Sequence, residues 1–206
     1  VSAYSSLGES YDSTQTSATP VNMNGRWRFD DATGLVATDS SGNGWNGTLV
    51  NGPVWTSGAN ARINGAISMD GVNDHVTLPA GIVSKFNNFT VSSWVYVNAF
   101  TTWARVFDFG TGTNNYMFLA PQYTATAPNA AKFRFAIRTA SVTEQQISSS
   151  TAITSGTWNH VAVTRSGNTG TLYLNGVVVG TNASMTLKPS SLGNTTLNYL
   201  GRSMFG

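Results

Sequence analysis

Cysteine is absent from this chain of 206 residues, so disulfide pairing gives no indication of the cellular compartment. Charged residues account for only 10% of the sequence, whereas a typical soluble domain has about 25%. No apolar run approaches the roughly 20 residues of a membrane-spanning helix. No run of lysine or arginine and no basic helix indicates nucleic-acid binding, and the formal net charge is only +2. We therefore expect neither a membrane nor a nucleic acid among its partners.

Serine, threonine, asparagine and glycine supply the polarity that charged residues do not. Such a low-charge composition is typical of a secreted bacterial module, so we expect an extracellular location. The sequence begins at Val1 without a signal peptide, and we interpret it as a processed or excised piece of a longer protein. Its length suffices for one all-β domain with a sizeable core.

Two regions of the chain differ in composition. Residues 1–24 are rich in serine and threonine and lack apolar periodicity, which predicts a linker or an arm lying on the domain. From residue 25 onward, short runs with strand character recur between turn residues. The predicted organisation is an N-terminal arm over residues 1–24 and one domain over residues 25–206.

Apolar residues in the domain recur with the period of two that is typical of β-strands. In residues 132–138 the apolar side chains, Phe133, Phe135 and Ile137, alternate with the basic ones, Lys132, Arg134 and Arg138. Residues 89–97 are apolar on both faces, which predicts a central strand. The pair Asn175-Gly176 between apolar runs predicts a hairpin. The fold class is therefore predicted to be all-β, a two-sheet antiparallel β-sandwich of the jelly-roll kind.

Several segments, taken in order, resemble a known family. They are WRFDDATGLVATDSSGNGWNGTL, GAISMDGVNDHVTLP, FTVSSWVYV, RVFDFGTGTNNYMFLAP and GTWNHVAVTRSGNTGTLYLNGVVVG. This ordered set is similar to the laminin G-like, concanavalin A-like jelly-roll domains of bacterial secreted proteins, over roughly residues 25–206. The resemblance implies two curved antiparallel sheets and a non-catalytic module of the kind commonly appended to glycoside hydrolases. Such domains often bind sugars and often hold one structural calcium.

The segment DSSGNGWNGTL, residues 39–49, has the composition of a cation-binding loop. Calcium takes six to eight oxygen ligands, and glycines let the backbone turn several carbonyls inward. Asp39 would supply charge, Asn43 and Asn46 further oxygens, and Asp31 or Asp30 a second carboxylate. With the resemblance in support, we predict calcium at this loop. The alternative is an ordinary loop capped by an Asx turn from Asp39.

Aromatic side chains in or beside loops are the candidates for sugar recognition, because flat aromatic faces pack against the C–H faces of sugars. The predicted carbohydrate-binding residues are Trp103, Arg105, Tyr116, Tyr123, Arg134 and Arg138. A stripe of arginines can also grip the carboxylate of an acidic sugar in bidentate fashion. The alternatives are a solvated sheet face for the arginines and loop or core packing for the aromatic residues.

Glycoside hydrolysis is not predicted, because it needs two carboxyl groups facing each other about 5–9.5 Å apart. Glu9 and Glu144 are the only glutamates, neither has an acidic neighbour at an alternate position, and Asp108 stands alone between aromatic residues. We predict a non-catalytic module of a polysaccharide-active protein that binds a polysaccharide or oligosaccharide. The alternative is a structural or protein-interaction module of a larger protein.

The resemblance also implies a strand that this sequence does not contain. In the family, a final strand usually follows a segment like LNYLGRSMFG and lies beside the first strand, here residues 26–29. The sequence ends at Gly206 before such a run, so we expect unpaired backbone groups and an apolar slot at that place. The expected occupants are the N-terminal arm, a C-terminal strand peptide supplied separately, or a neighbouring domain or molecule.

Overall fold

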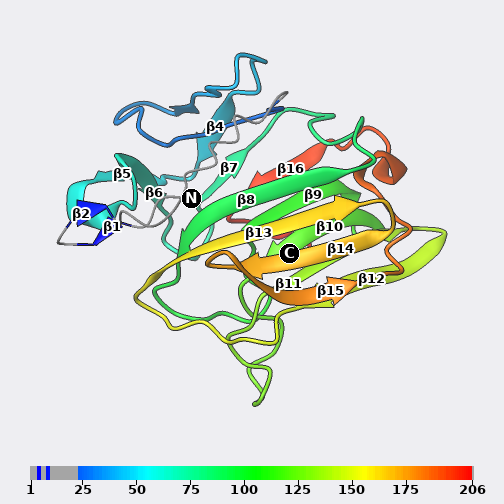
Figure 1. The fold of residues 1–206 in the computed structure, drawn as a ribbon. Coiled ribbons are helices and arrows are strands. Elements are labelled where there is room, and N and C mark those ends of the chain that lie inside the picture. The colour runs from blue at the N-terminus through cyan, green and yellow to red at the C-terminus, as the bar shows by residue number, and fades with distance from the viewer. Residues whose placement is uncertain (1–3, 6–7, 10–22, 206) are drawn as a thin grey trace.

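The computed structural model of the protein describes residues 4–5, 8–9 and 23–205. Its main strands form two antiparallel layers packed face to face, which confirms the predicted all-β sandwich (Figure 1). The strands of these layers are β3 (Val36–Ala37), β4 (Gly47–Val50), β7 (His75–Thr77), β8 (Phe89–Tyr96), β9 (Phe107–Gly112), β10 (Asn115–Ala120), β11 (Arg134–Thr139), β12 (Val142–Ser148), β13 (Trp158–Ser166), β14 (Thr169–Leu174), β15 (Val177–Asn182) and β16 (Leu197–Leu200). The remaining elements are the strand pairs β1 (Tyr4–Ser5) with β2 (Gly8–Glu9) and β5 (Val54–Ser57) with β6 (Gly65–Ser68), and the 3-10 turns η1 (Gly58–Asn60) and η2 (Pro189–Leu192).

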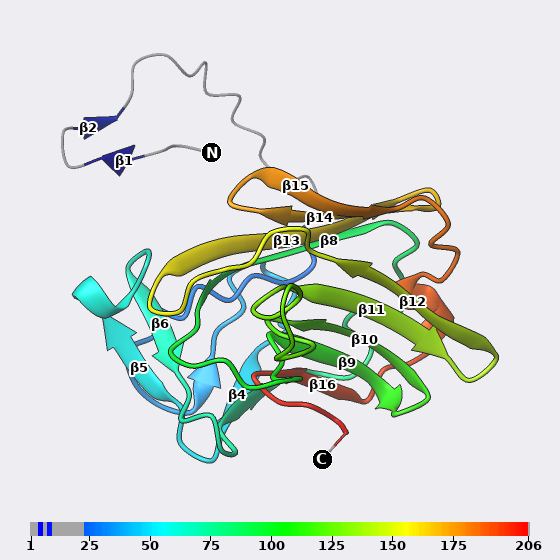
Figure 2. The same cartoon turned by 90° about the horizontal axis from the view of Figure 1, so that it is seen from below.

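The two layers differ in size. Counting the described strands, the larger sheet has eight in the order β12-β11-β10-β9-β16-β7-β4-β3, and the smaller has four in the order β15-β14-β13-β8. Figure 2 shows β13, β14 and β15 stacked over β9, β10 and β11. The late strand β16 lies between β9 and β7, so it joins the two halves of the large sheet.

The hydrophobic core lies between the layers and follows the alternation of the strands. Phe135 and Ile137 on β11 are fully buried, as predicted from the sequence, and Met117 on β10 is buried beside them. Val161 and Val163 of β13 meet them from the small sheet. Burying one such side chain contributes about 1.5–3 kcal/mol. The alternate side chains of β10 and β11 therefore point away from the core, to the outer face of the sheet.

The predicted hairpin is confirmed between β14 and β15. Leu174 pairs with Val177, which leaves Asn175 and Gly176 as the turn. Their φ angles are 50° and 83°, both in the left-handed region. A type I′ turn needs positive φ at both central residues, and asparagine followed by glycine tolerates this best.

The prediction of a central strand over residues 89–97 is wrong. Among the described strands, β8 pairs only with β13 and is the outermost strand of the small sheet. Its core-facing Phe89, Val91 and Val95 stay partly exposed, whereas Val161 and Val163 on β13 are fully buried. The apolar residues on both faces of this segment therefore did not indicate a central position. The local pattern of side chains does not determine how many neighbouring strands pair with a given strand.

The predicted arm over residues 1–24 lies mostly outside the described residues. Within it, β1 and β2 pair with Tyr4 opposite Glu9. Asn24, at its end, donates from Nδ2 to the carbonyl of Ile82 at 2.8 Å. The boundary near residue 25 stays a prediction. No helix in the described part of the chain is long and apolar enough to cross a membrane.

Candidate functional site

The outer face of the large sheet carries a group of aromatic and arginine side chains, here termed the outer-face cluster. Its members are Trp103, Arg105, Tyr116, Phe118, Tyr123, Arg134 and Arg138, which include every residue predicted to bind carbohydrate. They come from the segment before β9, from β10, from the segment after β10 and from β11. The structure therefore brings these residues together on one face, as their spacing alone could not show.

Strand alternation explains why β10 and β11 contribute to this face. Met117 points into the core, so its neighbours Tyr116 and Phe118 project outward. In the register of the sheet, Tyr116 lies opposite Arg138 and Phe118 lies opposite Ala136. Ala136 is small and fully buried, so it leaves room for the larger side chains that cover it.

Trp103, Tyr123 and Arg134 form the exposed part of the cluster. The Arg134 guanidinium lies 3.6 Å from the ring centre of Tyr123 and 6.0 Å from that of Trp103. The two rings are 6.3 Å apart, and Trp103 is 41% exposed. Arg134 Nε also donates to Ser148 Oγ at 3.1 Å. Contacts between a cation and an aromatic face hold this group together at the surface and fix the arginine.

Arg105 lies beneath this group in a buried ion pair. Its Nε donates to Asp108 Oδ2 at 3.1 Å, and its guanidinium lies 4.0 Å from the ring centre of Phe118. Burial raises the pKa of Asp108 to about 6, although Arg105 and the N–H of Met204 act to lower it. Burial likewise lowers the pKa of Arg105. Arg105 is therefore committed to Asp108 and supports the cluster from below, rather than offering a free cation to a ligand.

The backbone of Trp103 is held in an unusual conformation. Its φ is 66°, in the left-handed region that a bulky residue rarely adopts. Its N–H donates to the carbonyl of Gln122 at 2.9 Å, and its carbonyl accepts from Arg105 Nη1. The buried Gln122 side chain donates to Thr102 Oγ1 at 3.2 Å and accepts from the N–H of Ala131 at 3.0 Å. Gln122 thus clamps the segments that carry Trp103 and Tyr123. Sequence analysis missed it because a lone glutamine carries no local signal.

Tyr116 is packed into the cluster rather than presented at its surface. It is 4% exposed, and its hydroxyl donates to Glu144 Oε2 at 2.6 Å. Burial, together with the bond to Glu144, raises the pKa of Tyr116 to about 12. Phe205 packs edge-on against the ring at 5.1 Å. Beside it, the Nε atom of Arg138 is buried and has no hydrogen-bond partner among the described residues.

The Asp39 carboxylate accepts four hydrogen bonds from its own loop and from the preceding segment. Oδ1 accepts from the N–H groups of Arg26 and Ser41, both at 2.9 Å. Oδ2 accepts from Ser41 Oγ at 2.7 Å and from the N–H of Trp45 at 3.0 Å. Burial acts to raise the pKa of Asp39, but these bonds together hold it below its usual value. A carboxylate has about four acceptor positions, so protein donors fill those that a cation would need.

The other predicted calcium ligands are also engaged within the protein. Asn43 Nδ2 donates to backbone carbonyls at 2.9 and 3.0 Å, and Asn46 Oδ1 accepts from the N–H of Asp39 at 2.9 Å. Asp31 Oδ2 accepts from the N–H of Thr38 at 3.3 Å. No three His, Asp or Glu side chains in the described part of the chain gather as a metal site. As arranged, the Asp39 carboxylate closes an Asx-type loop with Ser41, and calcium at this loop stays a prediction from the sequence.

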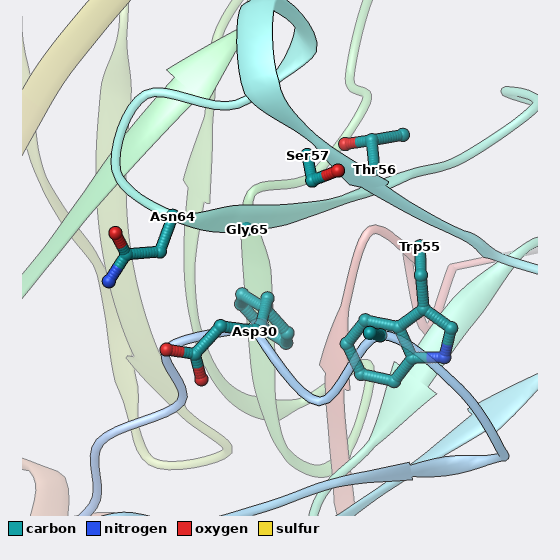
Figure 3. A pocket seen from close by; sticks show the side chains of 8 residues that line it. Asp30, Trp55, Thr56, Ser57, Asn64 and Gly65 are labelled. Carbon is teal, nitrogen blue, oxygen red and sulfur yellow. The ribbon is translucent and has the colours of Figure 1, made fainter.

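Two pockets lie away from the outer-face cluster. The pocket in Figure 3 holds about 100 Å³, with Asp30 and Asn64 on one side and Trp55 on the other. A second, of about 260 Å³, lies at the Asp39 loop and is lined in part by Asn43 and Trp45. Both are smaller than the roughly 300–1,000 Å³ of typical small-molecule sites. The outer-face cluster therefore remains the candidate site.

The chain is similar in sequence to a known family and in structure to several solved proteins. The family model described as the concanavalin A-like lectin/glucanases superfamily matches residues 70–206. Among solved structures, domain 4 of AbnA, a GH43 extracellular arabinanase from Geobacillus stearothermophilus in complex with arabinotriose, superposes with a TM-score of 0.72 at 22% identity. The match covers 89% of this chain and 84% of that one. At this identity the likeness shows the fold alone.

Two further structures are similar to a lesser degree. An S-layer domain-containing protein from Clostridium thermocellum is 38% identical, with a TM-score of 0.49 over 79% of this chain and 73% of that one. A Trypanosoma rangeli sialidase gives a TM-score of 0.53 at 13% identity, over 84% of this chain but only 27% of its own. No curated protein sequence matches the chain.

Proposed function

The chain belongs to the concanavalin A-like lectin/glucanase superfamily, and from that premise we propose that it is a non-catalytic carbohydrate-binding module whose binding surface is the outer-face cluster. The observation that carries the proposal is the group formed by Trp103, Tyr123 and Arg134, which presents an exposed indole beside a stacked guanidinium. Aromatic faces pack against sugar C–H groups, and a guanidinium donates to sugar oxygens. The arabinanase domain of the same fold, solved with arabinotriose, supports a sugar as the ligand.

The placement of the acidic side chains on this face supports binding without hydrolysis. Asp108 lies on β9 and Glu144 on β12, with β10 and β11 between them. Three strand spacings separate their backbones by about 14 Å, so the two acids come from strands that are not neighbours. Asp108 is in addition fully buried and paired with Arg105. Neither acid is free to protonate a glycosidic oxygen or to activate water.

The setting of the module forms part of the same proposal. We place it in a secreted bacterial protein that acts on polysaccharides, where it would hold neighbouring catalytic domains on their substrate. The low content of charged residues and the extracellular arabinanase whose domain shares the fold support this setting.

Glycan binding by the purified chain tests the proposal. Affinity electrophoresis and isothermal titration against plant and bacterial polysaccharides should identify a ligand, and Trp103→Ala should weaken its binding at least tenfold. Tyr96→Ala is the matched control, because Tyr96 is 43% exposed on the outer face of the other sheet, close to the 41% of Trp103. An equal loss in both variants, or binding unchanged by Trp103→Ala, would rule out the outer-face cluster as the site.

The open edge of β8 favours a second candidate function, a module completed by a strand from another polypeptide. Within the part of the chain that the structure describes, β8 is paired along its length on one side only, and its core-facing side chains are partly buried. Unpaired N–H and C=O groups along an edge strand are a template for strand addition. Exposed Lys85 precedes β8, and Arg62 lies 4.6 Å from the ring centre of Trp94 on it. Because β8 and β13 contain no acidic residue, the added strand would alternate apolar and acidic side chains.

Amide hydrogen exchange tests strand addition directly. A synthetic extended peptide in which valine alternates with glutamate should slow exchange of the β8 amides. The same peptide with lysine in place of glutamate should leave exchange unchanged. If neither peptide protects β8, or if light scattering shows that a second copy of the chain already covers it, the proposed acidic strand is wrong.

A further inference from the structure

The arginines of the outer-face cluster indicate which class of sugar it takes. We infer that the ligand is a linear polysaccharide bearing carboxylate groups, gripped by Arg134 and Arg138 along β11. This inference rests on the proposed function, because it concerns the same surface. It depends on how the charges of the face are distributed, on the spacing of the two arginines and on what already holds them.

The acidic groups of this face are engaged, whereas two of its arginines are not paired with any carboxylate. Asp108 is bound by Arg105, and Glu144 accepts the hydroxyl of Tyr116. Within the described residues, no carboxylate oxygen lies within 4.0 Å of a side-chain nitrogen of Arg134 or Arg138. The three arginines of the cluster outnumber the two carboxylates, so the face carries an excess of positive charge, which attracts an anionic ligand and repels a cationic one.

Arg134 is held in place before any ligand arrives. Its Nε bonds Ser148 Oγ at 3.1 Å, and its guanidinium lies 3.6 Å from the ring centre of Tyr123. No hydrogen bond to another nitrogen of this guanidinium occurs among the described residues. A fixed, planar fork of N–H donors suits the two oxygens of a carboxylate, because little side-chain freedom is lost on binding.

Arg138 has unmet hydrogen-bonding capacity at the other end of the same strand. Its Nε is buried without a partner in the part of the chain that the structure describes. Buried polar groups in folded proteins almost always have a partner, so an exception points to an absent acceptor. Arg138 is half-buried as a whole residue, so a ligand carboxylate that reached its side chain would supply such an acceptor.

The spacing of the two arginines points to an oligosaccharide rather than a single sugar. Arg134 and Arg138 are four residues apart on one face of β11, so their Cα atoms are about 13 Å apart. Between them lies Ala136, which is fully buried under larger side chains of the outer-face cluster, so a chain that reaches both arginines would pass over those side chains. Trp103 and Tyr123 stand at the Arg134 end, where a sugar ring can pack.

Matched acidic and neutral ligands test the inference. Uronic-acid oligosaccharides (galacturonate, mannuronate and glucuronate types) would be titrated beside the same oligosaccharides after chemical reduction of their carboxyl groups, with a neutral arabinan for comparison. We expect one acidic ligand to bind at least tenfold more tightly than its reduced form. Arg134→Gln and Arg138→Gln should each weaken acidic binding by about tenfold, and added salt should weaken it further. Arg26→Gln, at an exposed arginine away from the cluster, is the control.

The outcomes separate this inference from the proposed function. Binding that needs the carboxyl groups and both arginines supports it. Equal affinity for the acidic and reduced ligands, or tight binding of neutral arabinan that Arg134→Gln leaves unchanged, overturns the inference while the module remains a carbohydrate binder. No binding to any glycan overturns the proposed function itself.

Discussion

Replacing Arg105 with methionine tests how the buried ion pair with Asp108 shapes the outer-face cluster. In the intact protein, burial raises the pKa of Asp108 from 3.8 to about 6 even with Arg105 beside it. One pKa unit corresponds to about 1.4 kcal/mol, so the ionised carboxylate lowers stability at neutral pH by about 3 kcal/mol. Because the folded pKa lies above the unfolded one, the penalty is absent below about pH 4, grows between about pH 4 and 6, and is complete once pH has risen past about 6.

Without Arg105 the buried carboxylate has no cation to offset its burial. The pKa of Asp108 should then rise further, because Arg105 is the strongest of the groups that lower it. At pH 7 we expect Arg105→Met to lower the free energy of unfolding by about 3–5 kcal/mol, the usual loss when one partner of a buried pair is removed. At pH 4 Asp108 is protonated in both proteins, so the charge-dependent part of this loss should disappear. That part is at most about 1.4 kcal/mol, because in the variant the carboxyl can stay protonated at pH 7. Trp103 should also lose order, since its carbonyl accepts from Arg105.

Urea unfolding followed by tryptophan fluorescence from pH 4 to pH 8 measures these differences. The series would include the intact protein, Arg105→Met, Asp108→Asn and the control Arg26→Met, whose exposed side chain should matter by less than about 0.5 kcal/mol. If Arg105→Met loses the same stability at pH 4 and pH 7, the loss comes from packing against Phe118 and the charge argument is refuted. An identical pH profile for the intact protein and Asp108→Asn would show that Asp108 does not titrate near pH 6.

Three further substitutions address other parts of the molecule. Asp39→Asn should lower the free energy of unfolding by about 1–3 kcal/mol whether or not a chelator is present, because N–H and O–H donors hold the carboxylate; a loss seen only with calcium present would support the predicted calcium site instead. Gly65→Ala should destabilise by a similar amount, because its Cβ would stand 2.2 Å from the carbonyl oxygen of Phe29; an unchanged melting temperature would contradict this contact. Gly176→Val should lower stability by about 1–2 kcal/mol, because φ is 83° there, and an equally stable variant would show that the hairpin turn adjusts.

Local chemistry alone was enough to predict much of the sandwich. Side chains alternate across a strand with a period of two, so the pattern of residues 132–138 determined which of them enter the core and which reach the outer face. The turn at Asn175 and Gly176 was equally predictable, because few residue pairs tolerate two successive positive φ angles. The aromatic and arginine residues proposed for the site were identified from their residue types, and alternation along the strand also gave the face of Arg134 and Arg138.

Long-range pairing decided the rest. The sequence of residues 89–97 does not indicate that β8 has only one neighbouring strand. Its edge is open because no other described strand pairs with it. The packing of Arg105 against Phe118, the packing of Tyr116 against Phe205 and the clamp made by Gln122 depend on segments that meet only after the large sheet has assembled. The same holds for the Asp39 loop, whose carboxylate is occupied in part by Arg26. A sequence shows which groups a side chain can bind, but the partner it finds is set by the tertiary fold.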